Sequence, residues 1–398
     1  MANQINPPRG MRDFLPQEKS MREAMLAKIR SLYVSLGFQE IETPALEELE
    51  RLSSGQGGDN EKLVFKVQKR GQEFESALAQ NQELADLGLR FDLTVPLTRF
   101  YASHHSKLPK VFKAIQIGPV WRAERPQKGR YRQFMQCDID IVGDPSHLAE
   151  LELLSAALSA LAALGLKEAT IRVNHRELLT NNILSLGISA QDALSAMISI
   201  DKLDKIGIAG VANELGDKFG AEVSQRATLW LSDIDQAAIP ELLAPLFEGL
   251  AGHARLRFDP SLVRGMGYYT GSIFEIEHPE SGSSIGGGGR YDSMVGKYLG
   301  VDVPAVGISL GIERIMELVA PLESKTNAVV LLIPSPQFAL AALKLQAQGV
   351  ASGYRVRIEL RQKNLKTQLD DMQSQGFEFF AELTLEASFS ELNLKALG

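Results

Sequence analysis

The chain has 398 residues, enough to bury more than one core, and its 44% apolar and 23% charged residues are typical of a globular protein. No apolar segment near the N-terminus resembles a secretory signal, and the longest nearly apolar stretch, residues 153–166, is too short to cross a bilayer. The single cysteine excludes an internal disulfide and a cysteine-based zinc cluster. We therefore expect a cytoplasmic protein with no membrane partner.

The net charge of −7 argues against broad wrapping by nucleic acid, and no DNA partner is expected. Basic residues are nevertheless concentrated in residues 122–132, where Glu124 is the one acidic residue. The basic members of this strip are Arg122, Arg125, Lys128, Arg130 and Arg132. A cationic strip in an acidic chain predicts a local site for a few phosphates.

In the first half of the chain, apolar residues at helical spacing predict a helix over residues 18–36 that Gly37 ends, followed by an extended segment up to Pro44. The next predicted elements are strands at 63–67, 89–95, 111–122 and 135–142, with a turn at 69–72 after the first of them, and a buried helix at 147–164. A helical module rich in Ala, Leu and Asp is predicted over residues 177–250.

Strands at 254–258 and 272–278 and a helix at 311–319 are expected to complete a first domain, residues 1–320, into which the helical module is inserted. Residues 321–326 are predicted to be a linker. Beyond it, strands at 328–333, 354–360 and 377–383 alternate with helices at 337–348 and 364–374. This alternation predicts a small α/β domain with a mainly parallel sheet over residues 327–398.

The segment with the most chemical information runs from Trp121 to Gln136, where one strand leads through a Pro/Gly-bearing basic loop into a second strand. On the outgoing strand, Gln136, Asp138 and Asp140 alternate with apolar residues. Side chains two residues apart on a strand share a face, so these three are predicted to line a pocket.

This segment resembles motif 2 of class II aminoacyl-tRNA synthetases, in the form found in histidyl-tRNA synthetases. Three further stretches support the resemblance: residues 89–94 resemble the family's amino-acid-binding strand, 262–271 its histidyl-specific segment, and 307–314 its motif 3. Residues 8–13 resemble its N-terminus, and the helix and strand before Pro44 resemble motif 1. The resemblance is close over residues 8–320 and looser beyond, and it implies an α+β fold with an antiparallel sheet flanked by helices.

The resemblance implies a bacterial-type histidine–tRNA ligase with a shortened C-terminal domain, which activates L-histidine with ATP and transfers it to tRNA(His). It also implies a homodimer built through motif 1. Mg²⁺ is expected to bind mainly through the phosphates of ATP. The histidines of the chain lack ligand spacing, so no metal site made of protein side chains is expected.

Activation is attack of an ionised carboxylate on the α-phosphorus of ATP, which needs cations more than a general base. The resemblance places Arg122 at the α-phosphate and Arg264 opposite it, as the main catalytic residue. Arg314 would hold the γ-phosphate, and Glu124 would lie near the adenine or a metal-bound water. Arginine suits these roles because its planar fork binds phosphate bidentately and stays charged.

A neutral imidazole has one N–H donor and one nitrogen acceptor, so a selective pocket needs both kinds of partner. Asp140 would supply the acceptor and the hydroxyl of Tyr268 or Tyr269 the donor. The positions that match the family's contacts to the rest of the amino acid are Asp92, Leu93, Thr94 and Gln136, with the ammonium group assigned to Asp92, Thr94 and Gln136. At the tip of the motif 2 loop, Arg125 and Gln127 are expected to contact the acceptor end of tRNA.

The glycine run at residues 286–289 lacks the lysine and hydroxyl residue of a phosphate-binding loop, and the resemblance makes it a tight turn between central strands. The chain departs from the family pattern at Met135, at Gly267 and in the shortness of its last domain.

Two rival functions belong to other classes. One is a non-catalytic regulatory subunit of ATP phosphoribosyltransferase, which shares this fold but typically lacks the motif 2 and motif 3 arginines. The other is a tRNA-binding sensor without ligase activity, which would lack parts of the ATP site. The presence of Arg122, Arg264 and Arg314 argues against both.

Overall fold

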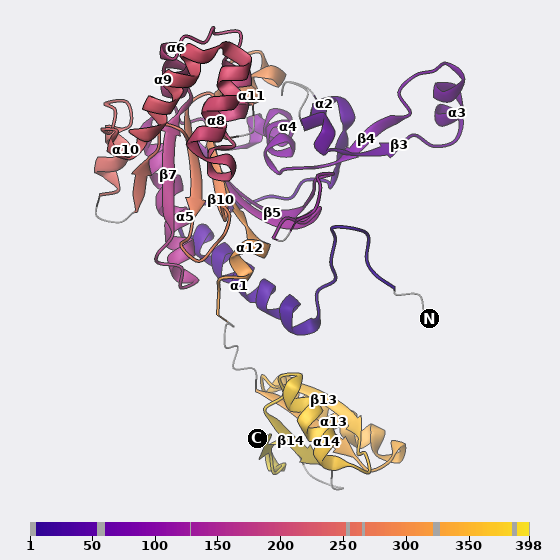
Figure 1. The fold of residues 1–398 in the computed structure, drawn as a ribbon. Helices are drawn as coiled ribbons and strands as arrows, with labels where there is room; N and C mark the ends of the chain where they lie inside the picture. Colours follow the sequence, from indigo (N-terminus) through magenta and orange to yellow (C-terminus); the bar gives the residue numbers. More distant parts are fainter. Residues whose placement is uncertain are drawn as a thin grey trace. The chain divides into compact units, whose positions relative to one another are not determined.

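The computed structural model describes residues 5–53, 60–127, 129–251, 255–264, 267–320, 327–383 and 388–397. The chain forms two compact units (Figure 1). The first contains residues 1–13 and 25–320, and the second contains residues 14–24 and 321–398. The predicted linker at 321–326 lies outside the described residues.

An eight-stranded sheet forms the centre of the first unit, with the order β1-β5-β6-β11-β10-β9-β7-β8. Its strands are β1 (Gln39–Glu40), β5 (Phe112–Trp121), β6 (Gln133–Val142), β7 (Thr170–His175), β8 (Leu256–Phe258), β9 (Ser272–Glu277), β10 (Gly286–Arg290) and β11 (Ala305–Gly311). The pairs β1/β5 and β7/β8 are parallel and the other pairs are antiparallel. The predicted α+β architecture is confirmed, with a mixed sheet that is antiparallel except for these two pairs.

Helices flank this sheet. They are α1 (Pro16–Ser35), of which residues 25–35 belong to this unit, α4 (Thr94–His104), α5 (His147–Ala163), α11 (Asp292–Leu299) and α12 (Ile312–Met316). Helix α5, predicted as a buried helix, packs against β6 and β11 and buries Leu153, Leu154 and Leu161 completely. Apolar burial of this extent, at roughly 25 cal/mol per Å², makes the α5–sheet contact a major source of stability.

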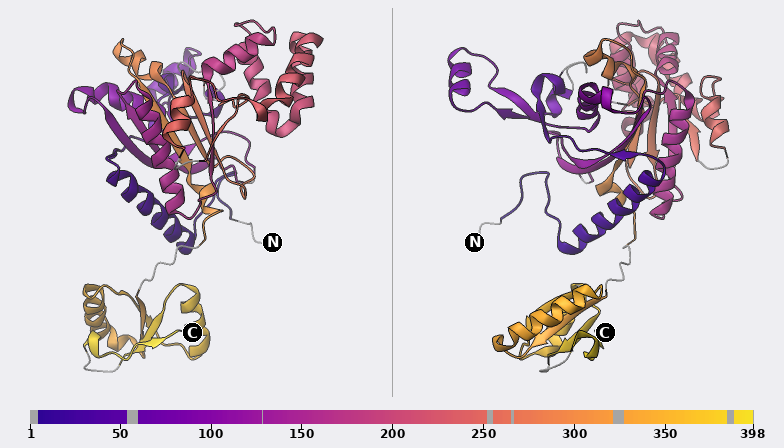
Figure 2. Two further views of the ribbon diagram at one scale, coloured as in Figure 1. Left: turned by 90° about the vertical axis from the view of Figure 1, so that its left-hand side faces the viewer. Right: turned by 180° about the vertical axis from the view of Figure 1, so that it is seen from behind.

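A smaller three-stranded sheet extends away from the main sheet and carries a short helix at its far end (Figures 1 and 2). Its order is β2-β4-β3, and the elements are β2 (Leu46–Glu48), α2 (Leu49–Ser53), η1 (Asn60–Leu63), β3 (Phe65–Gln68), α3 (Gly71–Ala79) and β4 (Ala85–Leu89). The predicted turn at 69–72 is therefore only partly correct, because Gly71 begins helix α3.

Helices occupy the range predicted for the helical module, and they gather beside one end of the main sheet (Figure 1). Its elements are α6 (Arg176–Ser185), α7 (Ala193–Ile200), α8 (Leu203–Phe219), α9 (Ala221–Ser232), η3 (Ile234–Gln236) and α10 (Ala244–Gly249). A separate apolar cluster that includes Ile183, Met197, Val211 and Leu231 holds these helices together.

The predicted strand at 89–95 is wrong. Strand β4 ends at Leu89, and helix α4 begins at Thr94. The carboxylate of Asp92 accepts a hydrogen bond from the Val95 amide at 3.2 Å and so satisfies a donor in the first helical turn. The strand was predicted because polar and apolar residues alternate across 90–94, which is the pattern of a half-buried strand.

The glycine run is not a tight turn but the central strand β10, paired on one side with β9 and on the other with β11. A Cβ atom at Gly288 would lie 1.9 Å from the carbonyl oxygen of Gly307 on β11. Glycine is therefore required for close approach of the two backbones rather than for reversal of the chain.

In the second unit, the sheet order is β13-β12-β14-β15, with β12 parallel to both neighbours and β15 antiparallel. The elements are β12 (Ala328–Ile333), η4 (Pro336–Phe338), α13 (Ala339–Ala351), β13 (Arg355–Leu360), α14 (Leu365–Ser374), β14 (Phe379–Glu382), η5 (Phe389–Glu391) and β15 (Lys395–Ala396). The predicted βαβαβ alternation and the small sheet domain are confirmed.

Candidate active site

Two adjoining cavities lie in the first unit. The larger, of about 570 Å³, lies between the β5–β6 hairpin and the region where α7 ends and α8 begins. The smaller, of about 50 Å³, is set into the main sheet. The residues that line both cavities are Arg122, Gln136, Arg264, Gly287 and Ser309. A molecule in the small cavity would therefore meet one in the large cavity beside two arginines.

Arg122 follows the last residue of β5, and its Nε donates to the carbonyl oxygen of Phe91 at 3.0 Å. Its guanidinium also lies 5.1 Å from the centre of the Phe134 ring. Burial lowers the pKa of Arg122, yet a guanidinium stays charged in a protein. No carboxylate among the described residues forms an ion pair with it, so Arg122 is a partly buried cation that favours an anionic ligand.

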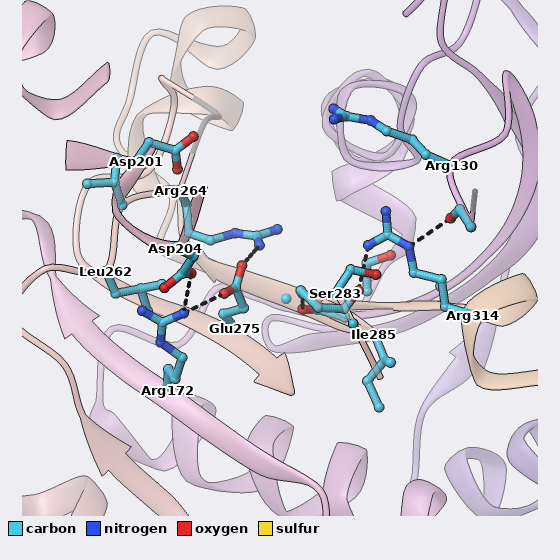
Figure 3. Close-up of a pocket in the computed structure, with 18 of the residues that line it drawn as sticks. Arg130, Arg172, Asp201, Asp204, Leu262, Arg264, Glu275, Ser283, Ile285 and Arg314 are labelled. Atoms are coloured by element: carbon cyan, nitrogen blue, oxygen red, sulfur yellow. Dashed lines mark hydrogen bonds and ion pairs between the residues drawn. The ribbon is translucent and has the colours of Figure 1, made fainter. Parts of the chain in front are cut away.

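Arg264 enters the large cavity from the side opposite Arg314 (Figure 3). Its Nη1 donates to the carboxylate of Glu275 at 2.8 Å, while its Nε is buried without a hydrogen-bond partner among the described residues. Glu275 also accepts a hydrogen bond from Arg172 at 3.2 Å, so one carboxylate is shared by two guanidinium groups. The charge of Arg264 is therefore only partly compensated.

Arg314 lies on α12, and its guanidinium donates only to backbone carbonyls in the part of the chain that the structure describes. Nε donates to Gly129 at 3.1 Å and Nη1 to Ser284 at 2.5 Å (Figure 3). Burial lowers the pKa of Arg314, and so do the nearby charges of Arg130, Arg122 and Arg264. All three predicted arginines, Arg122, Arg264 and Arg314, line the large cavity, so their positive charges converge there.

The small cavity is lined by three aspartates and three tyrosines. They are Asp92, Asp138, Asp140, Tyr268, Tyr269 and Tyr291. The hydroxyl of Tyr291 donates to Asp140 at 2.5 Å, and the hydroxyl of Tyr268 donates to Asp92 at 3.4 Å. The rings of Tyr268 and Tyr269 meet edge to face with centroids 4.8 Å apart. The cavity thus combines rigid aromatic walls with carboxylate acceptors.

These carboxylates are hard to ionise in the free protein. Burial raises the pKa of Asp92 to about 6 and that of Asp140 to about 7, and it raises the pKa of Asp138 well above its usual range. The negative charge of Asp140 adds to the effect on Asp138. A ligand that brings N–H donors or positive charge would favour the ionised forms.

The other predicted site residues are distributed as follows. Thr94 lines the small cavity, but Leu93 lines neither cavity: its side chain is buried and its carbonyl accepts a hydrogen bond from Gln116 at 2.9 Å. Glu124 lines the large cavity and forms an ion pair with Arg130. Arg125 and Gln127 are exposed at the tip of the β5–β6 hairpin.

Met135 and Gly267, which depart from the family pattern, both lie in the first unit. The backbone amide of Met135 donates to the Glu313 carboxylate at 2.8 Å, and Gly267 lies in a turn. Lys128, Gly265 and Met266, which belong to the resembling segments, lie outside the described residues.

Several residues of the cavities had no predicted role. Tyr291 directly follows strand β10, and Ser309 lies in motif 3, while Glu275 is on β9 and Asp201 and Lys205 come from the helical module. The alternation on β6 had already placed Asp138 in a pocket. The contact of Tyr291 with Asp140 joins strands far apart in the sequence, and no local pattern indicates it.

The described residues include no group of three or more His, Cys, Asp or Glu side chains placed to hold a metal ion. Among them there is also no helix with the length and apolar character needed to cross a membrane.

Comparison with known proteins agrees with this geometry. A family model of histidyl-tRNA synthetase matches residues 10–315. The chain is 50% identical over 428 aligned residues to the histidine–tRNA ligase of Leifsonia xyli subsp. xyli, which covers all of this chain and 99% of that protein. The histidine–tRNA ligase of Aeropyrum pernix is 38% identical over 387 residues, covering 89% of this chain and 84% of that one.

The crystal structure of histidyl-tRNA synthetase from Nostoc sp. PCC 7120 matches with a TM-score of 0.74 at 28% identity and covers 96% of this chain and 92% of that one. A Bacillus halodurans C structure described as an ATP phosphoribosyltransferase regulatory subunit/histidyl-tRNA synthetase has the same TM-score at 22% identity, which shows the fold alone. Both the sequence and the fold lead to one assignment: the chain belongs to the histidyl-tRNA synthetase family.

Proposed function

We propose that the chain is a histidine–tRNA ligase whose large cavity binds ATP and whose small cavity binds L-histidine. The observation that carries this proposal is that Arg122 and Arg264 line both cavities where they meet. That junction is where the carboxylate of an amino acid would approach the α-phosphate of ATP. The ligase activity follows from membership of the family, whereas the roles of individual residues are proposals.

In the first step, a carboxylate oxygen of histidine forms a bond to the α-phosphorus of ATP, and the bond from that phosphorus to the oxygen bridging to the β-phosphate breaks. Histidyl-adenylate forms and pyrophosphate leaves. No proton moves in this step, so the protein contributes position and charge. Arg122 and Arg264 would stabilise the negative charge that accumulates at the α-phosphate, and Arg314 would hold the γ-phosphate.

Histidine would be recognised through its imidazole and its ammonium group. Asp140, held in place by Tyr291, would accept a hydrogen bond from one ring nitrogen, and the hydroxyl of Tyr268 or Tyr269 would donate to the other. The family match assigns the ammonium group to Asp92, Thr94 and Gln136. A site that relies on such buried hydrogen bonds discriminates against analogues that lack them by roughly 10⁴–10⁵-fold.

In the second step, a hydroxyl oxygen of the terminal ribose of tRNA(His) forms an ester bond to the carbonyl carbon of the adenylate, and the bond from that carbon to the phosphate oxygen breaks. AMP leaves, and the hydroxyl proton passes to its phosphate or to solvent. The exposed tip of the β5–β6 hairpin, with Arg125 and Gln127, lies beside the large cavity and is proposed to contact the acceptor end. Phosphate contacts of this kind would make tRNA binding weaken as salt concentration rises.

ATP is expected to bring Mg²⁺, which neutralises charge on the phosphates. Mg²⁺ bound through ATP would need few protein ligands, because it usually keeps several waters. Glu124 and Glu313 are the carboxylates of the large cavity that come from the same region as Arg314, and they would take any direct or water-mediated contact with the ion.

The family resemblance also supports a homodimer built through motif 1 and a cytoplasmic location, and both remain proposals. Sedimentation equilibrium at micromolar concentration would give twice the mass of the chain if the dimer proposal holds.

The regulatory function is less well supported than ligase activity. The likeness to the Bacillus halodurans protein shows the fold alone, and the three arginines at the cavities have no evident use in a non-catalytic subunit.

The decisive experiment is ATP–pyrophosphate exchange with each of the twenty amino acids, followed by aminoacylation of tRNA(His). Exchange with histidine alone, together with formation of histidyl-tRNA, is the expected result. Exchange with no amino acid would refute the ligase proposal and favour a regulatory role.

A further inference from the structure

Two buried acceptor atoms in the small cavity lack a hydrogen-bond partner among the described residues. They are Oε1 of Gln136 and Oδ1 of Asp138. The side chains are 6% and 3% exposed, and both line the cavity. A buried acceptor without a donor is unfavourable, so a cavity with two of them favours a ligand that has N–H or O–H groups.

Ser309 fixes the direction of the Gln136 acceptor. It lies on β11 directly opposite Asp138 on β6. Its hydroxyl accepts a hydrogen bond from Nε2 of Gln136 at 2.6 Å. The Gln136 amide therefore turns its nitrogen toward Ser309, which leaves its oxygen without a partner in the described part of the chain.

Asp92, to which the family match assigns the ammonium group, is less available. One of its oxygens accepts a hydrogen bond from the Val95 amide at 3.2 Å, and the other accepts from the Tyr268 hydroxyl at 3.4 Å. Asp140 is likewise partnered by Tyr291 at 2.5 Å. Among the three aspartates of the cavity, Asp138 is the one with a buried oxygen that has no partner in the described part of the chain.

We propose that Asp138, together with Gln136, binds the α-ammonium group of the amino-acid substrate, and that Ser309 is the residue that positions Gln136. An ammonium group has three N–H donors and a positive charge, which match two free acceptors that include a carboxylate. The alternating spacing places both side chains on one face of β6, and Gln136 lies at the junction with the large cavity. This inference rests on the proposed function, since it concerns the same histidine site.

The test compares three ligands on the full-length chain by calorimetry and competition titration. L-histidine has the ammonium, carboxylate and imidazole groups, L-histidinol lacks the carboxylate, and 3-(imidazol-4-yl)propanoate lacks the ammonium group. In Asp138→Asn, which keeps the shape of the side chain and loses the charge, we expect histidine and histidinol to bind about 10- to 100-fold more weakly. The affinity for imidazolylpropanoate is expected to change less than about threefold.

Asp140→Asn is the matched control, because it makes the same chemical change two residues further along the same face of β6. It should weaken all three ligands, since all three have the imidazole group. Ser309→Ala should weaken histidine and histidinol about tenfold and leave imidazolylpropanoate unchanged, which separates positioning of the Gln136 acceptor from general damage to the cavity.

Equal weakening of histidine and imidazolylpropanoate by Asp138→Asn would overturn the inference, and so would unchanged affinity for histidine. In both cases a wild-type chain that binds histidine would leave the proposed function intact. A folded wild-type chain that does not bind histidine would overturn the proposed function and this inference together.

Discussion

The guanidinium of Arg264 and the carboxylate of Glu275 are joined by a hydrogen bond of 2.8 Å at the edge of the large cavity. Because Glu275 is shared with Arg172, it orients Arg264 without neutralising it fully. The remaining N–H groups of Arg264, including a buried Nε with no partner in the described chain, are left for a phosphate. A carboxylate thus positions the cation on which activation is proposed to depend.

Arg264→Ala should lower the rate of histidine-dependent pyrophosphate exchange by about 10³-fold, the order seen when an arginine that stabilises a transferring phosphoryl group is removed. The Michaelis constant for histidine should change less than tenfold, because the lost interaction acts mainly in the transition state. Arg255→Ala, which removes a half-exposed arginine paired with Glu168, is the control and should leave exchange unchanged. Near wild-type exchange by a folded Arg264→Ala protein would refute the catalytic role.

The Glu275→Gln variant tests whether the negative charge of Glu275 is needed to orient Arg264. The amide keeps one acceptor for Arg264, but it loses the negative charge that holds two guanidinium groups. We expect kcat for exchange to fall about tenfold, while KM for ATP falls or stays the same, because a carboxylate near the phosphates has been removed. A rise in KM for ATP with unchanged kcat would show that Glu275 acts only in nucleotide binding.

Asp140→Asn should raise KM for histidine about 10- to 100-fold and leave KM for ATP within about threefold of wild type. The carboxylate lies in the small cavity and does not line the large one. An amide in its place is a weaker, neutral acceptor for an imidazole N–H. Steady-state exchange kinetics with each substrate varied in turn would check this, and equal effects on both constants would show that Asp140 does not contact the imidazole.

Long elements with a regular pattern could be predicted from the sequence, and short or irregular ones could not. Strands β5 and β6 and helix α5 were predicted within a few residues because their side chains repeat over ten or more positions. The start of α4 was missed, because it depends on the Asp92 carboxylate accepting from Val95 rather than on periodicity. Strand β10 was mistaken for a turn, because glycines have no side-chain pattern and its identity comes from β9 and β11 on either side.

Within the site, residue types could be named from the resemblance, but their pairings could not. The contact of Tyr291 with Asp140 spans 151 positions of sequence, and that of Gln136 with Ser309 spans 173. Both depend on how β6, β10 and β11 align in the sheet. The sequence therefore predicted which polar residues belong to the site. Which of their acceptor atoms lack a partner depends on the strand register and could be seen only in the structure.

Gly307→Ala should impair histidine binding from the opposite strand. A Cβ atom at this position would lie 1.9 Å from Oδ1 of Asp140 and 3.3 Å from the Tyr291 ring, and only side-chain atoms are among its three nearest contacts. The added methyl group must displace the Asp140 carboxylate, so KM for histidine should rise more than about tenfold.

The Michaelis constant for ATP should change little in Gly307→Ala, since Gly307 does not line the large cavity. Circular dichroism and a thermal melt would establish that the variant is folded. A folded variant with wild-type histidine kinetics would mean that the position of Asp140 is not critical.

The last prediction concerns stability and pH. Burial raises the pKa of Asp140 to about 7 in the folded chain, whereas an exposed aspartate in the unfolded chain has a pKa near 3.8. The folded state therefore binds the proton more tightly, and the stability that this contributes is complete below about pH 4 and is lost as pH rises through about 7. A shift of about three pKa units corresponds to a maximum of roughly 4 kcal/mol.

Asp140→Asn cannot ionise, and its amide oxygen can still accept the hydrogen bond from Tyr291. We therefore expect the variant without ligand to unfold at higher urea concentration than the wild type at about pH 8, with a difference that widens between about pH 5 and 7 and levels off above. Asp92 and Asp138 are present in both proteins, so subtraction of the two pH profiles isolates Asp140 and its influence on these neighbours. A constant difference from about pH 5 to 8 would show that Asp140 does not titrate in this range. The burial of Asp140 in the small cavity implies that the ionised carboxylate, which would bind the imidazole, lowers the stability of the free protein. A constant difference would contradict this conflict between histidine binding and stability.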